Sequence, residues 1–174
     1  MADITKVLID DHQRVKRLLT SYEQSPWRLD LALAVCEELT VHSTIEEEIF
    51  YPALRDAVDE KLADDSEDEH AEIAEIAAAV EDMEPGDPDL ERTMRMLRAA
   101  LTRHLDKEEN VIFPKANLAL KADMIDLGRL AFARRQEFML AKAGAAGGPS
   151  LSMGTANVGW RTRGIKSATA NLGW

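Results

Sequence analysis

Two segments of this chain each occur a second time with the same pattern of residues, and this repeat constrains the fold more than any other feature. Residues 42–52 and 104–114 share a histidine, two glutamates and a proline at the same offsets. Residues 10–12 and 68–70 both place two acidic residues before a histidine. His12 precedes His42 by 30 residues and His70 precedes His104 by 34, so each half has the length of a helical hairpin. Two hairpins predict an antiparallel four-helix bundle.

Apolar residues recur at spacings of three and four up to about residue 143, and strand signals are scarce. We therefore expect an all-α fold, with a first helix over about residues 4–22. Ser25 and Pro26 are typical of the start of a second helix, which extends to about residue 49. Ser66 is typical of a capping box and opens the third helix. Residues 85–88 end that helix, and Asp87 caps a fourth that extends to about residue 111. A fifth helix, over about residues 123–143, lies against the bundle and carries no candidate ligand.

Composition excludes several classes of function. The 174 residues are 45% hydrophobic and carry a net charge of −11, which opposes binding to nucleic acid or to an anionic membrane surface. The longest apolar runs are far shorter than a membrane span needs. Cys36 has no partner for an internal disulfide and is expected to be an inert buried thiol, and the first residues lack the pattern of a signal peptide. We therefore expect a cytoplasmic protein.

The chain divides into a body, residues 1–143, and a tail, residues 144–174. Seven of the nine glycines lie in the tail, which has three basic residues and no acidic one, so the body carries −14. The tail repeats a hexamer that ends in tryptophan, at residues 155–160 and 169–174. Such a segment could dock on an acidic partner, on a protein shell that collects cargo, on a second copy of the chain or on its own body. The sequence leaves these alternatives open.

The histidines carry the main prediction about chemistry. In each His-x-x-x-Glu segment the two side chains project from one face of a helix, one turn apart. A single histidine in an apolar stripe is usually a core residue, but here all four histidines lie on the inner stripes of four successive helices. Buried without partners, four imidazoles and two carboxylates would be costly, so a positive ion must compensate them. The predicted metal ligands are His12, His42, Glu46, His70, His104 and Glu108.

The number of ligands bears on the kind of metal. One structural zinc needs about four ligands, whereas six inward ligands in two equivalent sets suit two octahedral ions bridged by carboxylates. Imidazole and carboxylate together favour iron over manganese or zinc. Glu47, Glu48 and Glu109 lie off the inward line and are expected to be solvated surface charges. Asp11 and Glu69 flank ligands, and could either orient imidazoles or serve as caps and surface charges.

These residues resemble the hemerythrin-like, or hemerythrin HHE cation-binding, family over about residues 5–140. The resemblance rests on His12, on His42 to Glu46 followed by residues 50–52, on Glu69 and His70, and on His104 to Glu108 followed by Phe113 and Pro114. It implies a four-helix bundle around two iron ions with an oxo or hydroxo bridge. Glu46 and Glu108 would be bridging carboxylates, with His12 and His42 on one iron and His70 and His104 on the other.

The chain departs from the oxygen-carrying hemerythrins, which have five histidines, two of them one turn apart on the third helix. Here Ala74 stands one turn after His70, so one iron lacks a protein nitrogen. Glu67, the phenol of Tyr51 if Pro52 distorts its helix, or water could fill that position. Each side chain also has an ordinary explanation, Glu67 as a partner of the helix dipole and Tyr51 as a core aromatic, and we favour that explanation for both.

An exchangeable position on a redox-active iron pair predicts a protein that reacts with oxygen or hydrogen peroxide, with catalase-like disproportionation of peroxide as the leading hypothesis. The alternative is a module that binds or senses oxygen, nitric oxide or iron without turnover. A third hypothesis is a metal-free helical interaction domain. No separate general base can be identified from the sequence.

Overall fold

The computed structural model describes residues 2–146, and these residues form helices and no strand. The tail repeats at residues 155–160 and 169–174, and the docking roles predicted for them, lie outside the described residues. The helical segments are α1 (Ile4–Glu23), α2 (Leu29–Ile45), η1 (Glu46–Phe50), α3 (Tyr51–Ala57), α4 (Glu60–Glu81), α5 (Leu90–Lys107), η2 (Glu108–Ile112), α6 (Phe113–Ala119) and α7 (Met124–Ala146).

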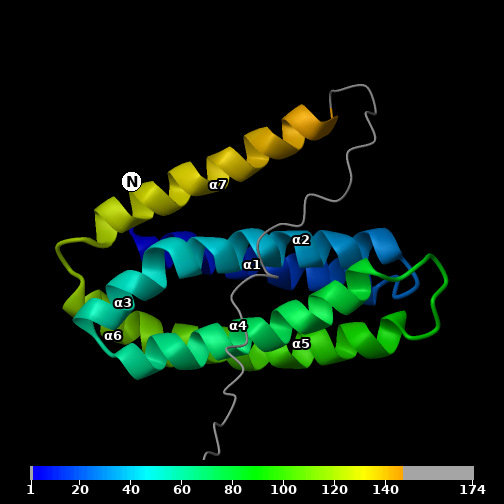
Figure 1. Cartoon of the computed structure of the whole chain (residues 1–174), viewed down its shortest axis with the longest axis horizontal. Helices are drawn as coiled ribbons and strands as arrows, with labels where there is room; N and C mark the ends of the chain where they lie inside the picture. The colour runs from blue at the N-terminus through cyan, green and yellow to red at the C-terminus, as the bar shows by residue number, and fades with distance from the viewer. Residues whose placement is uncertain (1, 147–174) are drawn as a thin grey trace, which may run out of the picture.

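Four rods make up the bundle, and they confirm the predicted all-α fold. The first rod is α1, and the second is α2 continued through η1 into α3. The third is α4, and the fourth is α5 continued through η2 into α6 (Figure 1). The hairpin of α1 and α2 lies over the hairpin of α4 and α5, and α3 and α6 close one end. Helix α7 lies outside the bundle, against α1 and α2. No helix within residues 2–146 combines the length and hydropathy that a membrane span requires.

Three predicted helix starts were wrong, and those of the second and third helices differ most from the structure. Helix α2 begins at Leu29, because Ser25 instead accepts a 3.0 Å hydrogen bond at its carbonyl from the Arg28 N–H and closes a turn. Helix α4 begins six residues before Ser66, capped by the carboxylate of Asp59, and the Ser66 hydroxyl donates to the carbonyl of Leu62 inside the helix. In both cases the capping residue type is present, but Ser66 uses its hydroxyl for a hydrogen bond inside the helix and Ser25 takes part in the turn through its backbone carbonyl alone.

The start of the fourth helix differs by a smaller amount. Helix α5 begins at Leu90, directly after Asp89, rather than after Asp87. The Asp87 carboxylate still accepts a hydrogen bond from a backbone N–H of this turn, that of Asp89, at 2.8 Å. Gly86, with φ of +90°, provides the reversal between α4 and α5 that a residue with a side chain would adopt only under strain.

The core divides into two apolar clusters on either side of a polar layer. One cluster lies toward the loops that follow α1 and α4 and includes Val15, Leu39, Ile73 and Leu101. The other lies toward α3, α6 and the start of α7 and includes Leu8, Ile45, Phe50 and Phe113, among others. Since Leu8 and Val15 flank His12 on α1, and Leu39 and Ile45 flank His42 on α2, the polar layer between the clusters is where the predicted ligands lie.

Candidate metal centre

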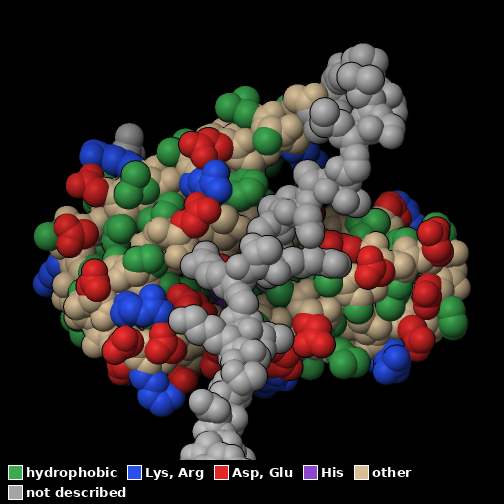
Figure 2. Space-filling view, viewed as in Figure 1, with side chains coloured by type: hydrophobic (Ala, Val, Ile, Leu, Met, Phe, Trp, Pro, Cys, Tyr) green, Lys and Arg blue, Asp and Glu red, His purple; other side chains and the backbone are tan. Residues whose placement is uncertain are grey.

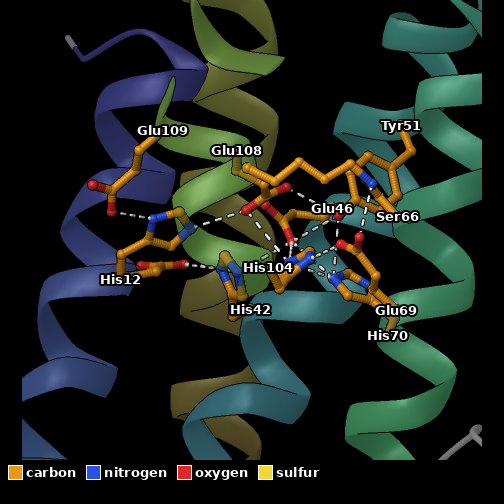
Figure 3. A network of polar contacts seen from close by, with 12 residues as sticks. His12, His42, Glu46, Tyr51, Ser66, Glu69, His70, His104, Glu108 and Glu109 are labelled. Atoms are coloured by element: carbon orange, nitrogen blue, oxygen red, sulfur yellow. Dashed lines mark hydrogen bonds and ion pairs between the residues drawn. The ribbon is translucent and has the colours of Figure 1, made fainter. Parts of the chain in front are cut away.

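The structure brings all six predicted ligands to one place in the middle of the bundle (Figure 3). Four separate rods supply them, and every one of these side chains is buried from solvent. Two overlapping groups of ligand atoms each lie within 4.8 Å of one another: His12, His42, Glu46 and Glu108 form the first, and Glu46, His70 and His104 form the second.

The two carboxylates each face imidazoles from both halves of the repeat. Glu108 Oε2 lies 3.2 Å from His12 Nε2 and 3.5 Å from His104 Nε2. Glu46 Oε2 lies 3.1 Å from His42 Nε2 and 3.2 Å from His70 Nε2. If His12 and His42 formed one binding position and His70 and His104 the other, each carboxylate would reach both positions.

The helices change their geometry where the two carboxylates stand. In η1 the N–H of Tyr51 donates to the carbonyl of Glu46, five residues back, and in η2 the N–H of Phe113 does the same to Glu108. In an uninterrupted α-helix a residue five positions on is turned about 140° away, whereas a π turn places it on the same face. The π turns therefore direct Tyr51 and Phe113 toward the centre.

Tyr51 is a buried core aromatic, as expected, and its hydroxyl also enters the centre. The oxygen lies 3.0 Å from Glu108 Oε1, 3.2 Å from His70 Nε2 and 3.4 Å from Glu46 Oε2. Burial, reinforced by the Glu108 carboxylate, raises the pKa of the phenol well above its ordinary value. Glu67, the other side chain considered for this position, instead pairs with Arg55 at 3.2 Å and is partly exposed.

Each imidazole turns its second nitrogen, Nδ1, toward a carboxylate outside the centre. Glu109 lies 2.8 Å from His12 Nδ1, Glu47 lies 3.1 Å from His70 Nδ1 and Glu69 lies 3.0 Å from His104 Nδ1. Asp11 faces His42 Nδ1 at 4.0 Å. Partners of this kind fix the orientation of a ligating imidazole and leave Nε2 free to bind a metal.

The prediction that Glu47 and Glu109 are solvated surface charges was therefore wrong, whereas Glu48 does lie at the surface and pairs with Arg134. Glu69 faces the His104 imidazole, which is the position that the orienting alternative requires of it. A signal for the missed pair exists in the sequence, because the Glu-Glu doublet occurs in both repeats. Helical periodicity alone did not identify this pair, because the second glutamate of each doublet contacts a histidine on a neighbouring rod.

The electrostatics of the centre leave polar atoms uncompensated. His12 Nε2, His42 Nε2, Glu46 Oε1 and Glu108 Oε2 are buried without a hydrogen-bond partner among the described residues. Burial raises the pKa of Glu46 well above its ordinary value and lowers the pKa of His42 well below. Burial also opposes ionisation of Glu108, but the charges of His104 and His12 outweigh it and hold its pKa below the usual range.

These features fit a metal centre. Orphaned buried nitrogen and oxygen atoms carry a cost of desolvation that a cation would offset, and the donors are of the imidazole and carboxylate types that divalent iron, manganese and zinc accept. Nε2 of His70 and Nε2 of His104 lie 3.1 Å apart, so two neutral imidazoles direct their lone pairs toward the same space unless a proton or a cation lies between them.

The fold and this centre together define a helical-bundle protein with a buried histidine and carboxylate site suited to cations. The chain belongs to the hemerythrin HHE cation-binding domain family, whose model matches residues 3–116. It is also similar to a protein named DNA nickase from Nostoc sp. (strain PCC 7120 / SAG 25.82 / UTEX 2576), with 27% identity over 114 residues. That match covers 64% of this chain, which spans only about a third, 32%, of the relative. No solved structure matches the chain significantly.

Proposed function

We propose that this chain holds two iron ions in the centre and reacts with oxygen or hydrogen peroxide, with catalase-like disproportionation of peroxide to water and oxygen as its activity. The observation that carries this proposal is the position of each carboxylate between one imidazole of each half, as two bridged ions require. Bound iron would supply two adjacent redox-active ions for electron transfer to and from peroxide.

The residues of the chain would have distinct roles. His12 and His42 would hold one ion, His70 and His104 the other, and Glu46 and Glu108 would bridge the two. The phenol of Tyr51 lies beside His70 and is proposed as the seventh protein ligand. The four outer carboxylates would orient the imidazoles, and the apolar clusters on both sides would keep bulk water and larger reductants away from the centre.

Action on DNA does not follow from the name of the Nostoc relative. The aligned part is a minority of that protein, and the present chain has a net charge of −11. Acidic side chains are spread across the visible face of the body (Figure 2). Such a surface repels a phosphate backbone, so we propose small molecules and no nucleic acid or membrane as partners. Cys36, buried and unpaired, is in keeping with the proposed cytoplasmic location.

Elemental analysis of protein produced in iron-replete medium tests the centre. We expect about two irons per chain in the wild type. His42→Ala and His104→Ala should lower this content, because each removes a ligand from a different position. Glu48→Gln is the matched control, since this glutamate stands among the ligands in sequence but pairs with Arg134 at the surface. Little iron, or one zinc that neither substitution affects, would refute the centre and leave a helical interaction module.

A peroxide assay of the loaded protein tests the activity. Catalase-like turnover should release one oxygen molecule for every two peroxides consumed, and both histidine variants should lose it. Full iron content without peroxide consumption would instead favour the module that binds or senses oxygen, nitric oxide or iron. Supercoiled plasmid without peroxide, included as a second substrate, should remain supercoiled.

A further inference from the structure

Helix α7 extends beyond the part of the chain that the family model matches, yet it contributes a side chain next to the metal centre. The match ends at residue 116, and α7 begins at Met124. From this helix Arg135 reaches the carboxylate of Asp11, with 3.1 Å between Nη1 and Oδ1. Asp11 precedes the ligand His12 on α1 and faces the imidazole of His42 on α2.

Asp11 is a fully buried carboxylate in a cluster of four charged groups. The guanidinium of Arg14 also pairs with Asp11, and both arginines pair with Glu38. Two positive and two negative groups thus balance one another, with Arg135 only 12% and Glu38 only 16% exposed. Removal of either arginine would leave an uncompensated negative charge beside His42, and such a charge is costly in the interior of a protein.

The partner of His42 differs from the partners of the other three histidines. Glu109, Glu47 and Glu69 are partly exposed and lie between 2.8 and 3.1 Å from the imidazoles that they face. Asp11 has no exposure, and its two oxygens face different groups: Oδ1 is directed to the two arginines, and Oδ2 stands 4.0 Å from His42 Nδ1. The arginines therefore hold one oxygen of this carboxylate while the other faces the imidazole.

We propose that Arg135 is a positioning residue of the metal centre, which acts on His42 by holding Asp11 in place. Helix α7 is then a functional part of the site and not only a cover of the bundle. This inference rests on the metal centre proposed above. Without Arg135, Asp11 Oδ1 would lose one of its two counter-charges, so the carboxylate would no longer be held with Oδ2 toward His42 and the imidazole would lose its present orientation.

Titration of the metal-free full chain with Co²⁺, followed by its visible absorption, tests the proposal. Arg135→Met should lower the affinity for one of the two Co²⁺ ions by about 10- to 100-fold and alter the absorption of that ion, because loss of a partner behind a ligating histidine has this effect. Arg135→Lys retains the charge and should recover part of the affinity. Arg134→Met removes the ion pair between α7 and Glu48, together with a pair to Glu137 within α7. It controls for weaker docking of the helix and should bind as the wild type.

A double substitution separates a positioning role from a structural one. If Arg135 acts through Asp11, Asp11→Asn should lower the affinity for the same Co²⁺ ion. Adding Arg135→Met to Asp11→Asn should then cause little further loss of affinity. Unchanged Co²⁺ binding in Arg135→Met, whatever its stability, would overturn the inference alone. An equal effect of Arg134→Met would overturn it as well. A wild type that binds no Co²⁺ would refute the proposed centre and, with it, this role for Arg135.

Discussion

Tyr51 and Phe113 occupy equivalent positions in the two halves of the chain, nine residues after His42 and His104, but only Tyr51 places an oxygen in the centre. The ring of Phe113 stacks on His12 with 5.5 Å between ring centroids, and the ring of Tyr51 lies 5.3 Å from that of His70. This one hydroxyl makes the two halves of the centre unequal. It lies beside His70, on whose helix the oxygen-carrying hemerythrins have their additional histidine.

Tyr51→Phe removes this asymmetry and tests whether the phenol is a ligand. Iron(III)-loaded wild type should show visible absorption from a phenolate bound to iron, and the variant should lose that absorption while it retains iron. The metal-free variant should also lose about 1–3 kcal/mol of stability, because Glu108 Oε1 loses its hydroxyl donor. Absorption spectra and denaturant titrations measure the two effects.

Tyr22→Phe is the matched control, since Tyr22 is the other tyrosine of the chain and its hydroxyl donates to the Pro26 carbonyl far from the centre. This variant should retain the visible absorption. A spectrum of Tyr51→Phe identical to that of the wild type would show that the phenol only packs beside the iron and that water or another group completes the coordination.

Metal removal should destabilise the bundle, because the centre leaves buried donor atoms without partners. A free metal concentration 1,000 times the dissociation constant stabilises a folded protein by about 4 kcal/mol. For a domain of this size that is an increase in Tm of about 8–16 °C, to be measured by thermal unfolding of chelator-treated and reloaded protein. His104→Ala should show a much smaller increase, and equal Tm values for loaded and metal-free wild type would contradict the prediction.

The sequence was sufficient to predict that six particular side chains would meet, because equal offsets in two hairpins and one helical turn between His and Glu are properties of the α-helix itself. It was not sufficient for the helix starts. Ser25 and Ser66 have the residue types of caps, but the choice among nearby caps depends on where the preceding helix ends and what it packs against.

Two features of the centre depended on tertiary contacts, and only for the first does the sequence contain a signal, the repeated Glu-Glu doublet. Glu47 and Glu109 lie beside the inward line of their own helices, and their role appears only once neighbouring rods bring His70 and His12 within reach. Arg135 lies on α7, a helix predicted to carry no ligand, and its contact with Asp11 depends on how this helix crosses α1. Tyr51 was foreseen as a candidate, and the π turn that directs it inward agrees with the distortion considered for Pro52.

Cys36 should react slowly with thiol reagents in the folded protein. The side chain is 1% exposed, and burial raises the pKa of the thiol to about 12, so the reactive thiolate is rare below that pH. At pH 8 we expect modification by a disulfide reagent to proceed only as fast as the chain opens, and to become rapid in denaturant. Fast modification of folded protein at pH 8 would contradict the burial of this residue between α2 and α4.

Gly128→Ala should detach the first turns of α7 from the start of α1. A β-carbon at this position would lie 2.3 Å from the carbonyl oxygen of Ala2 and 2.9 Å from the carbonyl carbon of Asp3, both of them backbone atoms that cannot turn aside. We expect a loss of about 1–3 kcal/mol of stability from this overpacking, measured by denaturant titration. Gly144→Ala is the control on the same helix, because nothing lies within 4 Å of its β-carbon. If Arg135 acts on the centre as proposed, Gly128→Ala should also weaken Co²⁺ binding while Gly144→Ala leaves it unchanged, and a stable Gly128→Ala variant would show that α7 does not dock this closely.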